Sequence, residues 1–357
     1  MYKGFVLFLL SLALIGGILY YVGFNETVGA MLSIRLEYFF LLILLQLFTM
    51  FLSAVKWRLI LRHVKVSFTN LLAATFVGYF INNITPIGMA GGEPVKAYLL
   101  SKKEGIAPEK AFSSVVVDLF LEIIPIFLLS SVAIFLILTN GISPEIALVI
   151  IAASFVLLLF FVLALTLAIN KEYSMKIINV LICSFSRIPY MKGRAEKIHS
   201  EIEVIYGKFN KAMKEQMLDN YILLFGTCIS IIVWSLRLLR VYVIFLAIGI
   251  NIPLATLVIV QAFAIVVTFI PVSPGALGIW EGTNIALFSL LGASAGVTAI
   301  KAATVTMIDR LIFYVFPTVL GVVSAMLLGV DVLGLVKKEA TGKVDMENVA
   351  KVIESET

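Results

Sequence analysis

Apolar residues along this chain gather in continuous blocks rather than in the alternating patterns typical of soluble helices or strands. Runs of about 18 apolar residues or more recur, and each is long enough to cross a hydrocarbon layer of roughly 30 Å at 1.5 Å per residue. They predict six membrane-spanning helices, at about 4–24, 36–61, 107–138, 145–169, 218–249 and 298–328. We therefore expect an all-α polytopic membrane protein.

Two further apolar segments, 69–100 and 253–292, are interrupted by clusters of Pro and Gly. The interrupting residues are Asn83, Pro86, Gly91, Gly92 and Glu93 in the first segment, and Pro274, Gly275, Gly278 and Glu281 in the second. Non-helical backbone at membrane depth leaves unpaired N–H and C=O groups, which persist only inside protein or beside a water-filled cavity. The pattern predicts two broken, re-entrant hairpins next to a cavity; a proline kink or an aqueous loop is the alternative.

Composition and charge agree with a membrane protein. Hydrophobic residues make up 61% of the 357 residues and charged residues 14%, whereas soluble domains carry about 45–50% and about 25%. The net charge of +5 lies in loops between spans, so no nucleic-acid partner is expected. Two cysteines and two histidines form no familiar metal-ligand cluster, so neither a metal nor another cofactor is expected.

The positions of the basic residues predict the orientation. Basic residues follow the second span at Lys56, Arg58, Arg62, His63 and Lys65, and they follow the first hairpin at Lys102 and Lys103. Segment 170–217 carries nine Lys or Arg residues. The connections 139–144, 250–252 and 293–297 carry no Lys or Arg. The positive-inside rule then places both termini in the cytoplasm, with the protein in the cell membrane and the hairpins entering from opposite sides.

The basic segment and the chain end have their own patterns. Residues 194–217 predict an amphipathic helix along the cytoplasmic interface, with an apolar stripe at Ile198, Ile202, Ile205, Phe209, Met213 and Met217. A plain connecting helix is the alternative. Residues 331–357 are polar and predict a cytoplasmic tail.

The two interrupted segments also share their spacing. Pro86 and Glu93 are seven residues apart, as are Pro274 and Glu281; Lys110 and Asp118 are eight apart, as are Lys301 and Asp309. The spacing predicts two repeats, 1–138 and 139–330, with 170–217 inserted in the second. Three crossings per repeat would invert the second copy, as in many secondary transporters, where sites lie between the repeats. Coincidence among common membrane residues is the alternative.

Several ionisable residues lie within apolar spans, where each costs roughly 2.5–3.5 kcal/mol on insertion scales. Asp118 and Glu122 share one helix face, and so do Arg237 and Arg240. Paired arginines suit a phosphate, which a guanidinium binds through two parallel hydrogen bonds. The candidate residues for binding a lipid head group are Arg237, Arg240, Arg310, Asp118, Glu122, Asp309 and Lys96. The alternative is that these acids and bases only neutralise one another. Glu93 and Glu281 are expected to cap half-helices or, alternatively, to bind a coupling proton.

The paired motifs resemble a known family. The stretch from Asn83-x-x-Pro86 to Gly91-Gly92-Glu93 and Lys96, the stretch Pro274-Gly275-x-x-Gly278-x-x-Glu281, and Asp309-Arg310 followed by Tyr314 and Pro317 are similar to the lysylphosphatidylglycerol synthase transmembrane-region family over residues 5–330. The resemblance implies a flippase-like module that moves a lipid across the bilayer, beside a separate lipid-modifying enzyme. Family members often carry Arg after the first-motif Glu, where the nearest basic residue here is Lys96.

The leading hypothesis is a lipid translocase, a flippase or scramblase, for an anionic phospholipid or a polyprenyl-phosphate lipid. The sequence carries no Walker motif, so the driving force would be a gradient or the lipid's own imbalance. One alternative is a membrane enzyme that uses intramembrane carboxylates on a lipid-linked substrate. Others are a small-anion transporter and a scaffold for a partner enzyme.

Overall fold

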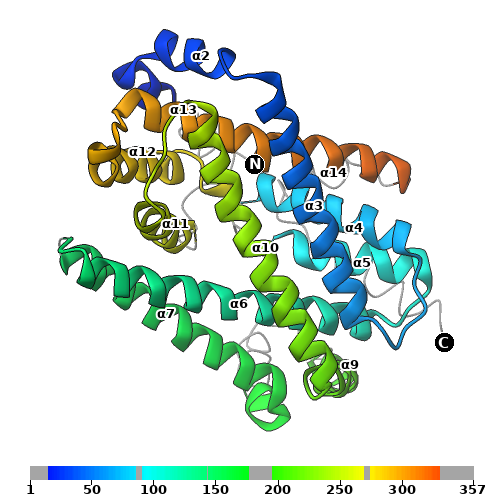
Figure 1. Ribbon diagram of the computed structural model, residues 1–357. Helices are drawn as coiled ribbons and strands as arrows, with labels where there is room; N and C mark the ends of the chain where they lie inside the picture. The colour runs from blue at the N-terminus through cyan, green and yellow to red at the C-terminus, as the bar shows by residue number, and fades with distance from the viewer. Residues whose placement is uncertain (1–14, 86–90, 143, 177–194, 269–273, 330–357) are drawn as a thin grey trace.

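The computed structural model describes residues 15–85, 91–142, 144–176, 195–268 and 274–329, and these residues form helices joined by short turns, without a strand (Figure 1). The α-helices are α2 (Phe24–Leu32), α3 (Leu36–Ile60), α4 (Phe68–Ile84), α5 (Gly92–Glu104), α6 (Pro108–Thr139), α7 (Pro144–Ile169), α9 (Ala195–Met217), α10 (Asn220–Ala247), α11 (Leu254–Thr268), α12 (Ile279–Leu291), α13 (Ala299–Arg310) and α14 (Phe316–Leu327). A π-helical turn, η5 (Leu311–Val315), joins α13 to α14, and a short 3-10 turn, η3 (Pro274–Ala276), precedes α12.

Five helices among the described residues are long and apolar enough to cross a membrane. They run over 36–60, 108–139, 145–169, 220–247 and 299–327, which confirms five of the six predicted spans. The predicted first span, 4–24, lies largely outside the described residues. Its described part is helical over 15–22 and ends at Gly23, whose φ of +116° breaks the helix before α2 begins. The helical region therefore continues past the predicted end, to residue 32.

Both interrupted segments form helical hairpins. Helices α4 and α5 pack against each other, as do α11 and α12. At the open end of the first hairpin, Glu104 accepts hydrogen bonds from the backbone N–H of Ser67 at 2.9 Å and from the Asn70 amide at 2.5 Å. At the open end of the second, the Thr256 hydroxyl lies 3.3 Å from the Leu291 carbonyl oxygen. Each hairpin thus returns to its starting side. The tips 86–90 and 269–273, with Pro86, lie outside the described residues.

Small residues let the first hairpin close tightly. A Cβ added at Gly92 would lie 2.0 Å from the Gly78 carbonyl oxygen, so the backbones of α5 and α4 touch there. Helices α14 and α4 also approach closely, because a Cβ at Gly321 of α14 would lie 2.5 Å from the Phe76 carbonyl oxygen of α4. Such close backbone approach is typical of helix packing within membranes.

The predicted cytoplasmic segments meet at one end of the molecule. His63, after α3, lies 3.1 Å from Asp219, which precedes α10. Lys208 of α9 lies 3.4 Å from Glu109 at the start of α6. The gathering of basic segments agrees with the positive-inside pattern; the side of the membrane on which this end lies stays a prediction.

The helix predicted over 194–217 is present as α9, and it packs on α6, α7 and α10. Met213 is buried, Phe209 and Met217 are half-buried, and Ile205 at the far part of the stripe is exposed. The apolar stripe therefore docks on the bundle at its C-terminal half. The predicted tail 331–357 lies outside the described residues.

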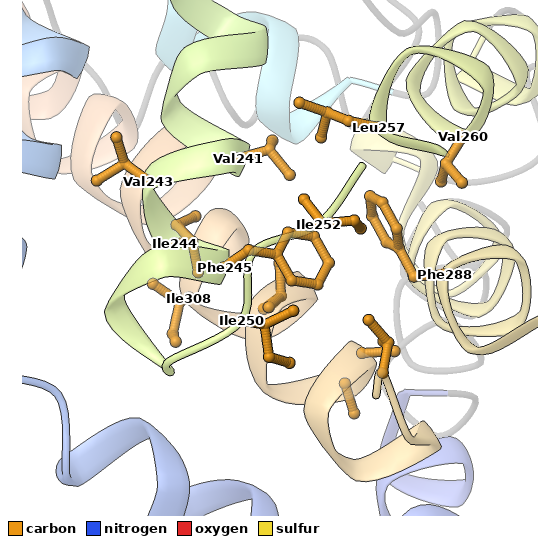
Figure 2. Close-up of a cluster of buried hydrophobic side chains, with 14 of the residues drawn as sticks. Val241, Val243, Ile244, Phe245, Ile250, Ile252, Leu257, Val260, Phe288 and Ile308 are labelled. Carbon is orange, nitrogen blue, oxygen red and sulfur yellow. The ribbon is translucent and has the colours of Figure 1, made fainter. Parts of the chain in front are cut away.

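The largest apolar cluster fills the space between α10, α11, α12 and α13 (Figure 2). Phe245 and Phe288 meet edge to face at its centre, with ring centroids 4.9 Å apart. Between the halves, α10 packs along α3, α14 packs against α4, and α6 packs against α11. These contacts fix the positions of the charged residues described next.

Candidate functional site

Lys56 lies at the centre of a buried ion-pair network. Its ammonium nitrogen lies 3.0 Å from Asp118 Oδ1, contacts Glu122 Oε1, and lies 3.2 Å from the Ser230 hydroxyl. The sequence pattern placed Lys56 with the basic residues after the second span, and that placement is wrong: the residue belongs to α3 and is 1% exposed. Two carboxylates one turn apart on α6 draw it into the bundle, because an ion buried this deeply requires opposite charge.

Lys96 extends the network to the first hairpin. Its ammonium nitrogen lies 2.5 Å from Glu93 Oε2 and 3.1 Å from Asp118 Oδ2, and it lies 5.0 Å from the centre of the Trp57 ring. Glu93 therefore pairs with Lys96, and within the described residues it does not make the capping contact expected from the sequence. The N–H of Gly92 is instead satisfied by the Asn82 side-chain oxygen at 2.6 Å.

Arg237 ends the network on the side of α10. One guanidinium nitrogen lies 3.8 Å from Glu122 Oε2, and the group stacks on the Trp234 ring at 4.5 Å from its centre. Trp234 in turn donates its indole N–H to the same Glu122 oxygen at 2.6 Å. Because the Arg237 side chain is 22% exposed, against 1% for Lys56 and 7% for Lys96, it is the most accessible cation of the network.

Arg240, one turn further along α10, has different partners. It donates to Asp309 Oδ1 at 2.6 Å and to the Gln46 side-chain oxygen at 2.7 Å. The two arginines therefore have separate partners: α10 faces α6 at Arg237, and faces α13 and α3 at Arg240. Arg240 is 6% exposed, and its charge is balanced by Asp309.

Arg310 holds the second hairpin. Its guanidinium pairs with Glu281 and donates to the carbonyl oxygens of Gly275 at 3.1 Å and Ala276 at 3.4 Å. The guanidinium also lies about 5 Å from three aromatic rings, those of Trp280, Phe313 and Tyr314. Glu281 accepts the backbone N–H of Gly278 at 2.6 Å, which is the capping contact expected for it. Arg310 is thus occupied by protein groups.

The two hairpins meet beside the π-helical turn. The Tyr314 hydroxyl donates to the Asn83 carbonyl oxygen at 2.7 Å, and the Asn83 amide donates to the Tyr314 carbonyl oxygen at 3.0 Å. A Cβ at Gly275 would lie 2.4 Å from the Tyr314 ring, and the φ of Gly275 is +57°, so the close approach and the backbone both require glycine. Asn83, Gly275 and Tyr314 therefore join both hairpins to the last span.

Sequence reasoning found the acids and arginines of the site but missed Lys56, Gln46 and Trp234. Lys56 was detectable, because it lies inside the predicted apolar run 36–61 with Trp57 directly after it. Gln46 and Trp234 carry no charge and gave no signal in an apolar run. Within the described parts of the chain, no group of three or more His, Cys, Asp or Glu residues is arranged to hold a metal ion.

Comparison with known proteins places the chain. The family model described as the lysylphosphatidylglycerol synthase transmembrane region matches residues 8–321. A UPF0104 membrane protein of Methanothermobacter thermautotrophicus is 33% identical over 87% of this chain and 89% of its own length. UPF0104 membrane proteins of Pyrococcus horikoshii and Methanocaldococcus jannaschii are 30% and 25% identical, over 89% and 91% of this chain and 95% of each relative. The chain belongs to the lysylphosphatidylglycerol synthase transmembrane-region family, whose fold here is an all-helical, multi-pass membrane protein.

Proposed function

We propose that this protein is a lipid translocase that moves the phosphate-bearing head group of an anionic phospholipid or a polyprenyl-phosphate lipid across the cell membrane. One observation carries the proposal. Within the network, Arg237 is a partly exposed guanidinium stacked on an indole, and its contact with Glu122, at 3.8 Å, is the longest of the network's ion pairs. A guanidinium held in this way binds a phosphate through two parallel hydrogen bonds.

The geometry narrows the candidate residues of the site. Arg240 and Arg310 are paired with protein groups, namely Asp309, Gln46, Glu281 and backbone carbonyls. Their role in the proposal is to hold α10, α13 and the second hairpin in position. In the proposal, Arg237 contacts the phosphate, and Trp234 and Glu122 hold the Arg237 side chain in position.

The packing of the helices supports a two-fold design with the repeats 1–138 and 139–330. The helices of the second predicted span in each repeat, α3 and α10, pack on each other. The last span of each repeat packs against the hairpin of the other, α6 on α11 and α14 on α4. Reciprocal contacts of this kind are what a two-fold axis between inverted halves produces, and such halves rock around a site between them.

The test is head-group movement in proteoliposomes, followed by the loss of fluorescence when a membrane-impermeant reductant reaches labelled phosphatidylglycerol. Arg237→Gln should slow the movement about ten- to a hundredfold, because a hydrogen bond to a charged group contributes about 1.5–3 kcal/mol. The matched control is Arg58→Gln, since Arg58 donates to the Leu61 carbonyl oxygen at the end of α3 and is not part of the network. Movement of no anionic lipid by the wild type, or equal rates in both variants, would exclude the proposal.

A further inference from the structure

The six charges of the Lys56 network form an alternating chain. Following the ion pairs from the first hairpin to α10, the order is Glu93, Lys96, Asp118, Lys56, Glu122, Arg237. Three carboxylates face three cations, so the chain is electrically neutral as it stands. Arg237 is its only cation with a single carboxylate neighbour among these pairs.

A phosphate at Arg237 would break this balance. The phosphate adds at least one negative charge beside Glu122, and the six residues of the network include no further cation to balance it. Among the other described elements packed on α6, α11 has no ionisable residue, and α7 has only Glu145, at its start. Of the lysines on α9, Lys208 faces Glu109 in the first turn of α6, and Lys211 and Lys214 are exposed. An uncompensated charge is strongly disfavoured inside a bundle within a membrane.

We infer that Glu122 is the proton-binding site that couples to head-group binding, taking up one proton when a singly charged phosphate occupies Arg237. This inference rests on the proposed function. The proton is supplied by water and becomes bound to a Glu122 carboxylate oxygen, so that the negative charge of Glu122 is replaced by that of the phosphate. No covalent bond of the lipid changes.

The surroundings single out Glu122 among the three acids. Asp118 lies between two lysines at 3.0 and 3.1 Å and stays paired with both. Glu93 keeps Lys96 at 2.5 Å and lies at the far end of the chain. Glu122 is the carboxylate next to Arg237, and its side chain is the most exposed of the three, at 16% against 11% and 12%. It therefore faces the incoming phosphate and is the acid most open to water.

The experiment is calorimetric titration of the full chain in detergent micelles with short-chain phosphatidylglycerol and, separately, with undecaprenyl phosphate. Each titration is made in two buffers that differ in ionisation enthalpy, so that the difference in heat counts the protons taken up. For the wild type with phosphatidylglycerol we expect about one proton per lipid bound and an affinity that falls by up to about tenfold per pH unit on the alkaline side.

Three variants sharpen the test. Glu122→Gln already lacks one negative charge, so it should bind the lipid with no proton uptake and with little dependence on pH. Glu109→Gln makes the same chemical change elsewhere on α6 and should behave as the wild type. Arg237→Gln should lose binding and uptake together.

The outcomes separate the inference from the function. Lipid binding by the wild type without proton uptake would overturn the inference and leave the proposed function standing, and the wild-type titration alone decides this even if a variant fails to fold. Full uptake in Glu122→Gln would overturn the assignment to Glu122. Binding of neither lipid by the wild type would overturn the proposed function, and with it the inference.

Discussion

Replacing Lys56 with Met tests the buried network most directly. The substitution keeps the length and the apolar stem of the side chain but removes the ammonium that contacts Asp118, Glu122 and Ser230. Removing one partner of a buried ion pair costs about 3–5 kcal/mol of unfolding free energy, because the remaining charge stays buried. Asp118 would keep Lys96 at 3.1 Å, so we expect a loss near the lower limit, about 3 kcal/mol.

The assay is unfolding by titration with SDS in mixed micelles, followed by tryptophan fluorescence. Lys65→Met is the control, because Lys65 is exposed after the end of α3 and should change the unfolding free energy by no more than about 0.5 kcal/mol. A second variant that combines Lys56→Met with Glu122→Gln removes one charge of each sign. It should lose less than the sum of the single variants, by roughly 0.5–3 kcal/mol. A Lys56→Met protein within about 0.5 kcal/mol of the wild type would refute the reasoning.

Three further predictions concern the first hairpin, the apolar core and the end of the molecule where the basic segments gather. Gly92→Ala should lower the unfolding free energy by about 1–3 kcal/mol in the same SDS titration, because the new Cβ would lie 2.0 Å from the Gly78 carbonyl oxygen. Phe288→Ala should lower it by about 3–5 kcal/mol, because the ring is 1% exposed within the cluster of Figure 2. The pKa of Asp219 is lowered below its ordinary value of 3.8, mainly by the hydrogen bond with His63 and to a smaller extent by hydrogen bonds from the backbone N–H groups at the start of α10. The Asp219 carboxylate should therefore stabilise the fold at pH values above 3.8, and this stabilisation should be lost as the pH falls through the lowered pKa. SDS titrations at several pH values should show this loss in the wild type and not in Asp219→Asn.

Each of these has a control within the chain. Gly207→Ala on α9 meets no atom within 4 Å and should leave the stability unchanged or slightly higher, so equal effects at 92 and 207 would contradict the close contact. Leu290→Ala should lower the unfolding free energy far less than Phe288→Ala, because Leu290 is 68% exposed. An acid-dependent loss that persists in Asp219→Asn would assign it to another group.

Apolar run length predicted the class and the spans, because a hydrocarbon layer imposes one minimum length on every crossing helix. Glycine and proline predicted the two hairpins for an equally local reason, since each break must be buried against protein. The first span shows a limit of this reasoning. Its predicted end, at about residue 24, lies next to the break at Gly23, but the apolar run did not reveal the further helix over Phe24–Leu32.

The candidate site depends on contacts between residues far apart in the sequence, and this is why the sequence revealed its charges but not their partners. Arg237 and Arg240 stand three positions apart in one apolar run, and the cost of burying either is the same to a reader of the sequence. Their contacts differ because Glu122 of α6 lies 3.8 Å from the first, whereas Asp309 of α13 lies 2.6 Å from the second. A charged residue within a membrane span indicates that a partner must balance its charge. The residues of the opposite helix decide how closely that partner is held, and the 3.8 Å contact of Arg237 with Glu122 is the observation on which we base the proposed phosphate contact.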